Sequence, residues 1–318
     1  YFIHNIFVFD NLTSYILFFA VLAYITVRAN GHKETSSAHP LFGKDTMNLI
    51  VIPIIGVVLI ITQYYVNYRP LTVNNLVIKA MSVGQYMQTM PFPEAVKMQQ
   101  DAFENAIAMN TLGSIEAREQ FMQMVPRMAQ IQIPDQMSQA DKQAAVTALN
   151  GLLMAGRKDV DSSYEAYKND VRMLSLYGAF FNGIGDAVSA ERVLGRAHEL
   201  APNKQLISYD LIKSQLMQQK TADAYALGRA TYDLGINCNS ALKWFLISAA
   251  YNRSYKEAEA YAISKGQEVA LDQDVLGALL STGQQNVVVE ILSKEKAKNP
   301  ALAPQIDAYI KQLFAPKK

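Results

Sequence analysis

The sequence contains few of the side chains from which metal sites and nucleophilic active sites are usually built. Its 318 residues include a single cysteine, Cys238, which excludes a disulfide bond within the chain, and only four histidines. The histidines are scattered, at His4, His32, His39 and His198. No second histidine, cysteine or carboxylate stands near His4 at the spacing of a metal site, so we interpret His4 as structural. We predict no metal site in the chain.

The familiar sequence motifs of catalysis are also missing. There is no phosphate-binding loop of the Walker A type, and the HExxH, CxxC and GxSxG patterns do not occur. The segment NGIG at residues 182–185 has two glycines but lacks a third, and it falls in a turn of the repeats described below. Glycosylation triplets occur at Asn11 and Asn252, but such triplets are common by chance. We therefore predict no catalytic residue and no cofactor-binding residue.

Charge is scarce and unevenly distributed. Charged residues make up only 18% of the chain, and the net charge is +1. Because there is no basic stripe with interleaved aromatic residues, the composition predicts no nucleic-acid partner. Residues 1–66 carry few charges and two long apolar runs, whereas residues 70–318 resemble the helical sequence of a soluble protein. This contrast predicts a membrane part followed by a soluble helical part.

The two apolar runs have the composition of transmembrane helices. Residues 12–27 and 47–66 contain no charged residue, and about 20 apolar residues are needed to cross a bilayer. Three tyrosines gather at the end of the second run, as aromatic residues do at a membrane surface. We predict spans at about 12–28 and 47–66 within a transmembrane region 1–68. A pair of buried helices in a large soluble core is the less favoured alternative, since such helices seldom run this long without a polar face.

The hydrophilic connector between the two runs, residues 28–45, sets the predicted orientation. It contains Arg28, Lys33 and Lys44, and basic residues in short loops favour the cytoplasmic side. We therefore place the connector inside the cell and everything after Tyr68 outside. A secretory signal peptide is a poor interpretation of the first run, which lacks a basic leader and a small-residue cleavage site.

The chain begins inside apolar sequence without a methionine, and we interpret residues 1–9 as the tail of a preceding span of a longer protein. Asp10 and Asn11 would then form a tight outer turn, with one side chain accepting hydrogen bonds from the first N–H groups of the next helix. The alternative is an intramembrane carboxylate at Asp10 that acts in catalysis or proton transfer. We favour the cap, because Asp next to Asn before an apolar run is a signal for a helix start.

A tetratricopeptide-like pattern occupies residues 171–202. Small and large apolar residues fill the helix-packing positions of this 34-residue pattern. The small residues let two helices approach closely, and the large ones fill the space between units. The matching positions are Leu174, Gly178 and Phe181 in the first helix, Gly185 in the turn, Ala190, Leu194 and Ala197 in the second helix, and Pro202 at the end.

The same spacing continues along the chain. Ala190, Ala224 and Ala258 recur at the constant period of this pattern, and a fourth, weaker unit has Gly283 in its turn. Three or more stacked units suffice for a stable solenoid. We predict an all-α fold in which transmembrane helices are followed by an α-solenoid of tetratricopeptide-like repeats over residues 161–318. A generic helical bundle is the alternative.

Residues 69–160 are predicted to form a helical connecting region. Apolar residues in the segment FPEAVKMQQDAFENAIAMNT recur at the spacing of one helix face. Pro126 and Pro134 are expected to break the helical pattern. The segment GRKDVDSSYEAYKND is expected to start the helix that leads into the repeats.

The order of these segments resembles that of a family of membrane proteins. FVFDNLTSYILFFAVLAYI is followed by a span ending in YYVNYRPLTVNNLVIKA, then by DAFENAIAMNTLGSIEAREQF, and then by the repeats. Over essentially the whole chain, this order resembles the C-terminal part of an O-antigen ligase-like protein, from the superfamily of O-antigen ligases and polymerases. It is similar to the bacterial subgroup in which a tetratricopeptide domain follows the last spans.

The resemblance implies a multi-pass glycosyltransferase of the bacterial cytoplasmic membrane, which transfers a glycan from a polyprenyl-diphosphate carrier to an acceptor on the outer side. It implies the lipid bilayer, the lipid-linked glycan and the acceptor as partners, and no metal or nucleotide cofactor. The key Arg and His of the family lie in earlier spans and in a large external loop, so no residue of this sequence takes a catalytic role. The repeats would bind the acceptor, or a protein or peptide. The alternative is a membrane-anchored tetratricopeptide scaffold with no enzymatic role.

Overall fold

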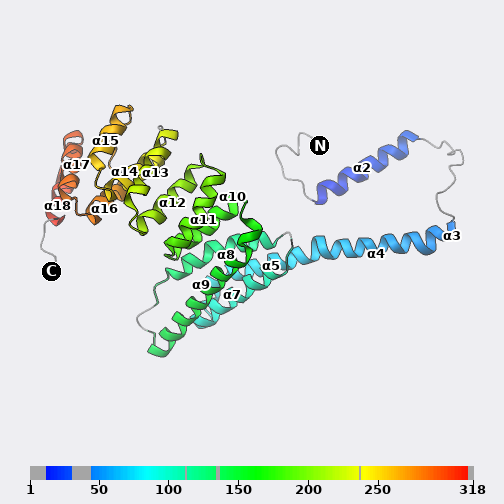
Figure 1. The fold of residues 1–318 in the computed structure, drawn as a ribbon. Coiled ribbons are helices and arrows are strands. Elements are labelled where there is room, and N and C mark those ends of the chain that lie inside the picture. Colours follow the sequence, from blue (N-terminus) through cyan, green and yellow to red (C-terminus); the bar gives the residue numbers. More distant parts are fainter. Residues whose placement is uncertain (1–11, 31–43, 112, 134–136, 236–237, 314–318) are drawn as a thin grey trace. The chain divides into compact units, whose positions relative to one another are not determined.

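The computed structural model describes residues 12–30, 44–111, 113–133, 137–235 and 238–313 (Figure 1). All regular secondary structure in these ranges is helical, and no strand occurs in them. The prediction of an all-α protein is therefore confirmed.

The chain divides into two compact units, residues 1–62 and 63–318. The elements of the first unit are α2 (Leu12–Asn30), α3 (Lys44–Thr46), the π-helical turn η1 (Met47–Val51) and α4 (Ile52–Gln63). The last residue of α4, Gln63, falls in the second unit. The predicted turn at Asp10 and Asn11 lies outside the described residues, as do His4 and residues 31–43 of the connector.

One helix in the described part of the chain is long and apolar enough to cross a membrane, and it runs unbroken from Leu49 to Met81. Its 33 residues correspond to about 50 Å at 1.5 Å per residue. None of its most apolar stretch is buried, and Ile60, for example, is 71% exposed. A helix that is apolar on all sides has no polar face to present to water, so it needs lipid or an apolar partner. A second apolar helix, Phe18–Ala29, is shorter than a span.

The second unit begins with a group of helices that pack around α7. Its elements are η2 (Tyr64–Tyr68), α5 (Arg69–Met81), α6 (Val83–Tyr86), α7 (Phe92–Ala108), α8 (Ser114–Ala129) and α9 (Gln139–Tyr167). Helix α5 buries Val73, Val77 and Ala80 at helical spacing and packs against α7 and α8. Helix α7 also contacts α8 and α9, so it lies at the centre of this group.

The prediction that Pro126 breaks a helix is wrong. Pro126 lies inside α8, which continues to Ala129. Its missing N–H removes one hydrogen bond close to the point where the helix ends anyway. The ring is also packed closely, because a Cβ atom added to Gly183 would lie 2.6 Å from Cβ of Pro126. Pro134, the second predicted breaker, lies outside the described residues.

The prediction that a helix starts at GRKDVDSSYEAYKND is also wrong. Residues 156–167 of that segment lie in the C-terminal half of α9, which begins at Gln139, and its last residue, Asp170, caps α10. The start signal is Ser138, whose Oγ accepts a hydrogen bond of 3.1 Å from the backbone N–H of Asp141. A serine followed three residues later by a carboxylate is a common N-terminal cap, and it outweighs the polar composition further along.

Eight helices follow as four pairs in chain order (Figure 1). They are α10 (Val171–Gly183) with α11 (Ala187–Leu200), α12 (Gln205–Met217) with α13 (Thr221–Leu234), α14 (Asn239–Tyr251) with α15 (Tyr255–Ser264), and α16 (Gln273–Ser281) with α17 (Gln285–Lys298). The short helix η3 (Pro300–Leu302) and α18 (Ala303–Leu313) close the described part. The first helix of each pair contacts the first helix of the next pair, so α10, α12, α14 and α16 form one row.

The turns inside the four pairs share one backbone conformation. Gly185, Gln219, Arg253 and Gly283 all have positive φ, between 60° and 83°. The first three are evenly spaced at the repeat period, and Gly283 follows after a slightly shorter interval. In each turn the next N–H bonds to a carbonyl five residues back, as from Asp186 to Phe181 at 2.9 Å. This is the Schellman end of a helix, which requires the left-handed conformation at its last position.

The repeat positions predicted from the sequence are buried. Ala190, Ala224 and Ala258 are fully inaccessible, each in the second helix of its pair. The apolar residues of the first repeat, Leu174, Phe181, Leu194 and Ala197, are also fully buried. Two cores result, one formed by residues between 73 and 211 and one by residues between 209 and 306. The connecting helices therefore share their core with the first helix pair.

Candidate binding groove

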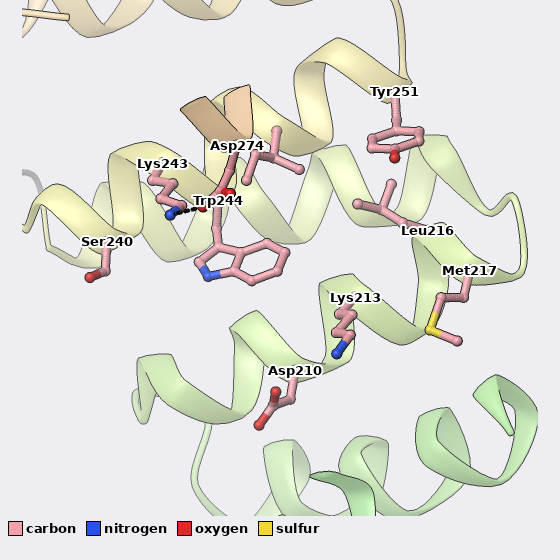
Figure 2. Close-up of a pocket in the computed structure, with 10 residues that line it drawn as sticks. Asp210, Lys213, Leu216, Met217, Ser240, Lys243, Trp244, Tyr251 and Asp274 are labelled. Carbon is pink, nitrogen blue, oxygen red and sulfur yellow. Dashed lines mark ion pairs between the residues drawn. The ribbon is translucent and has the colours of Figure 1, made fainter. Parts of the chain in front are cut away.

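The row of first helices carries an open groove between α12, α14 and α16 (Figure 2). Its volume is roughly 610 Å³. The lining combines charged, hydroxyl and apolar side chains: Asp210, Lys213, Leu216, Met217, Ser240, Lys243, Trp244, Ile247, Tyr251 and Asp274. We refer to this feature as the binding groove.

Trp244 is the only tryptophan of the chain and forms a wall of the binding groove. Its indole reaches from α14 toward Asp210 and Lys213 on α12 (Figure 2). Tyr209 supports it from behind, with the two rings stacked at a centroid distance of 6.2 Å and an interplanar angle of 15°. Because Tyr209 is itself buried, the indole is held in a fixed orientation while remaining partly exposed.

The charged groups of the binding groove fall into two sets. Lys243 pairs with Asp274 and lies 3.8 Å from a carboxylate oxygen of Asp272. The hydrogen bond to Asp274 and the nearby carboxylates raise the pKa of Lys243 despite partial desolvation. Lys243 is therefore already paired within this set, which has one ammonium and two carboxylates.

Asp210 and Lys213 form the second set, and neither has an ion pair among the residues that the structure describes. Burial raises the pKa of the Asp210 carboxyl, and the charge of Lys213, one turn further along α12, acts in the opposite direction. A half-buried carboxylate without a hydrogen-bond donor is unfavourable. A donor supplied by a ligand or by water would relieve this cost.

The histidine, the cysteine and the metal-ligating residue types do not form a cluster in the described part of the chain. Over the described ranges, no group of three or more His, Cys, Asp or Glu side chains could hold a metal ion. The described histidine, His198, has the hydroxyl of Ser208 beside it, 3.4 Å from Nδ1. Cys238 precedes the first residue of α14, and its thiol lies 3.7 Å from the hydroxyl of Tyr209. Hydrogen bonds from the Ala241 backbone and from Tyr209 lower the pKa of this thiol.

The segment NTLGSIEAREQF, which stood out in the sequence, is a structural element. Asn110 adopts a positive φ of 47°, and Ser114 donates from Oγ to the carbonyl of Ala106 at 2.9 Å, which joins the end of α7 to the start of α8. Arg118 forms a bidentate pair with Asp159 at 2.7 and 3.1 Å and lies over the ring of Tyr167. These contacts fasten α8 to α9.

The anchor of α5 lies directly before this segment. The guanidinium of Arg69 donates to the carbonyl of Met109, at the C-terminal end of α7. A positive charge there is favoured by the helix dipole. The same guanidinium lies 5.3 Å from the ring centre of Tyr65. Arg69 thus connects the exposed tyrosines at the start of the second unit to its core.

The sequence reasoning missed the residues of the binding groove, although the repeat period carried a signal for them. Asp210 and Trp244 are separated by one repeat period, and so are Ser240 and Asp274. They therefore occupy equivalent positions of consecutive first helices. The groove could have been located by aligning the sequence with itself after a shift of one period. Its positions are those that are partly exposed and carry chemically different residues in consecutive units.

Comparison of the chain with models of known protein families gave no match, and comparison with curated proteins gave no match either.

Proposed function

We propose that this chain is the membrane-attached recognition part of a multi-pass glycosyltransferase that resembles the O-antigen ligases and polymerases. In this proposal the helical repeats form a tetratricopeptide-like α-solenoid on the outer side of a bacterial cytoplasmic membrane. They select the acceptor, or a protein or peptide partner, for glycan transfer carried out elsewhere in the protein. The observation that carries the proposal is the binding groove on the row of first helices.

The apolar helix supports the membrane attachment. Residues 49–66 are uncharged and mostly exposed, which in water would leave a large apolar surface unsatisfied. At the end of this stretch Tyr64, Tyr65 and Tyr68 are about half exposed. Tyrosine is enriched at the level of the lipid headgroups, because its ring is apolar and its hydroxyl is polar. A bilayer would cover the apolar stretch and leave the tyrosines at its surface.

The helix pairs support the recognition role. The recurring left-handed turns and the row of first helices are in keeping with tetratricopeptide-like repeats, in which each unit contacts mainly its neighbours. Such arrays present extended surfaces on which side chains can vary without disturbing the packing. The binding groove has this character, since it is open to solvent and stands beside fully buried alanines.

The transfer chemistry itself has no candidate residues in the predicted spans. Transfer from a diphosphate-linked lipid needs cationic groups for the departing diphosphate and a base for the acceptor hydroxyl. Residues 12–27 and 47–66 contain no Arg, Lys or His. We therefore assign recognition to this chain and catalysis to other parts of the proposed enzyme. The purified 318-residue chain in lipid should show no transfer when assayed beside the full protein, and transfer by the chain alone would contradict this division.

The predicted topology is tested by cysteine labelling in intact cells. Cys238 is first replaced by serine, and single cysteines are then introduced at Ser36 in the connector and at Ser264, which is exposed at the end of α15. A membrane-impermeant maleimide should label Ser264→Cys but not Ser36→Cys before lysis, and both afterwards. If only Ser36→Cys were labelled in intact cells, the topology would be the reverse of the predicted one.

The gene sequence upstream of the codon for Tyr1 distinguishes the scaffold alternative from the proposed enzyme. The scaffold predicts a start codon shortly before this codon. The enzyme predicts many further spans upstream and a long external loop with Arg and His.

A further inference from the structure

The binding groove has the parts of a site for an uncharged sugar. A pyranose ring has one face of C–H groups and an edge of hydroxyl groups. It therefore fits a site that combines an aromatic face with a few well-placed polar groups. The volume of roughly 610 Å³ lies within the range of about 300–1,000 Å³ that is usual for small-ligand sites.

The aromatic face is supplied by Trp244. The indole is the largest flat apolar surface in the binding groove, and stacking on Tyr209 fixes its orientation. The C–H groups of a sugar carry small positive partial charges, and the face of an aromatic ring is negative. A pyranose lying on the indole would cover apolar surface on both partners without placing a hydroxyl group in an apolar environment.

The polar groups are supplied by Asp210, Lys213 and Ser240. A carboxylate accepts hydrogen bonds from two hydroxyl groups, an ammonium donates to hydroxyl oxygens, and a serine hydroxyl does both. Figure 2 shows Asp210 and Lys213 on α12, across the groove from Ser240 and Trp244 on α14. The carboxylate of Asp210 has no ion pair or hydrogen-bond donor among the described residues, so it is available to sugar hydroxyls.

The charges of the groove lining do not single out an ionic ligand. Its lining contains two carboxylates, Asp210 and Asp274, and two ammonium groups, Lys213 and Lys243. The pair of Lys243 with Asp274 is already satisfied. An ionic group that one of Asp210 and Lys213 attracts is repelled by the other, one turn away on α12, so this pair favours neither sign of ligand charge. A neutral ligand with many hydroxyl groups uses both residues at once.

We infer that the binding groove is a saccharide site, in which Trp244 is the stacking platform and Asp210 and Lys213 hydrogen-bond the hydroxyl groups of a neutral sugar. The inference rests on the proposed recognition role of the repeats, and it identifies the acceptor glycan, rather than a peptide, as what they recognise. It does not depend on where the transfer chemistry takes place.

The single tryptophan allows a direct measurement. The full chain is purified in a detergent without a sugar head group, because alkyl glycosides would compete for the site. Tryptophan emission is then recorded during titration with maltohexaose, with chitotetraose, and with three blocked tetrapeptides that are neutral, Lys-containing and Glu-containing. We expect a saturable change in emission with at least one oligosaccharide in the millimolar range or below, and none with the charged peptides.

Two variants separate recognition from general effects on folding. Asp210→Asn keeps the shape but lowers the accepting strength of the side chain, and it should weaken sugar binding at least fivefold. Asp223→Asn is the matched control, because Asp223 lies exposed on α13 outside the groove, and it should change the affinity less than twofold. Circular dichroism confirms that both variants fold. Trp244→Leu, followed by saturation-transfer NMR of the sugar, should abolish binding.

Each outcome decides the question. A response to the peptides alone would overturn the saccharide inference while leaving the recognition role of the groove intact. No response to any probe, by emission and by saturation-transfer NMR, would overturn the inference and the assigned role of the groove. Equal weakening by Asp210→Asn and Asp223→Asn would mean that the sugar binds outside the groove.

Discussion

The close contact between α10 and α11 should be sensitive to a single methyl group. Gly178 lies in α10 and faces Leu194 of α11, and both residues are buried. A Cβ atom added to Gly178 would overlap Cγ and Cδ2 of Leu194 and would lie 2.9 Å from Cδ1. The change Gly178→Ala therefore tests whether the pair of helices depends on this close approach.

Two opposing contributions set the expected magnitude. Replacing glycine by alanine inside a helix stabilises it by about 0.5–1 kcal/mol through backbone entropy and helix propensity. Inserting a methyl group into a filled core costs about 1–3 kcal/mol. Because three atoms of Leu194 stand in the way and Leu194 is fully buried, the upper half of that range applies. We expect Gly178→Ala to lower the free energy of unfolding by about 1–2.5 kcal/mol.

Gly195, on the neighbouring helix α11, is the matched control. A Cβ atom there meets nothing within 4 Å, so Gly195→Ala should raise the free energy of unfolding by about 0.5–1 kcal/mol. The assay is urea denaturation of the chain in micelles, followed by far-ultraviolet circular dichroism. Changes of opposite sign for the two variants are the expected result.

A double-mutant cycle tests the cause. Leu194→Ala alone should cost about 2–5 kcal/mol by leaving a cavity. In the double variant, the methyl group introduced by Gly178→Ala enters the space that Leu194→Ala leaves empty. The decrease in the free energy of unfolding should therefore be smaller than the sum of the two single decreases by about 1 kcal/mol or more. The reasoning is refuted if Gly178→Ala is as stabilising as Gly195→Ala, or if the two losses simply add.

Two further predictions follow from the turns and from a buried phenol. Gly185→Ala should lower the free energy of unfolding by about 1 kcal/mol, because residue 185 has a positive φ. Gln219→Gly and Arg253→Gly should leave the free energy of unfolding unchanged or raise it by up to about 1 kcal/mol. Urea denaturation of the three variants measures these changes. Burial, partly opposed by the hydrogen bond with the Ser163 hydroxyl, raises the pKa of Tyr177 to about 12. The stability that depends on neutral Tyr177 should therefore be complete below pH 10 and lost between pH 10 and about 12, and urea midpoints should fall less steeply over that range in Tyr177→Phe.

The parts of the fold that the sequence predicts are those in which every unit must meet the same steric requirement. Ala190, Ala224 and Ala258 are fully buried where second helices pack, so a larger residue would be excluded from each. This constraint repeats with the period of the structure and is visible in one sequence. The turns obey the same conformational requirement, yet Gln219 and Arg253 meet it without glycine. Composition alone could identify only the turns at Gly185 and Gly283.

The predictions failed where a local signal competed with tertiary context. Pro126 is a strong breaker by its own chemistry, but its place near the end of α8 and its packing on Gly183 make it tolerable. The run of charged residues in GRKDVDSSYEAYKND looked like a boundary. It is instead the exposed side of a long helix whose buried positions include Val160 and Ser163. For Pro126 the contact comes from a helix distant in the sequence, which a local pattern does not contain, whereas the start of α9 is set by its own cap at Ser138.

The binding groove was hidden for a different reason, which also explains why it can be specific. Positions 210 and 244 are equivalent in consecutive units, yet one carries a carboxylate and the other an indole. Repeats are detected from similar residues at equal spacing, so positions with dissimilar residues do not contribute to the detection. In a repeat array, however, the packing residues must agree from unit to unit, whereas solvent-facing residues, including those of a groove, are free to differ. Under the proposed recognition role, ligands would be distinguished at groove positions that are one period apart but carry different side chains. Asp210 and Trp244 are such a pair, and together they give this array an aromatic face opposite an unpaired carboxylate.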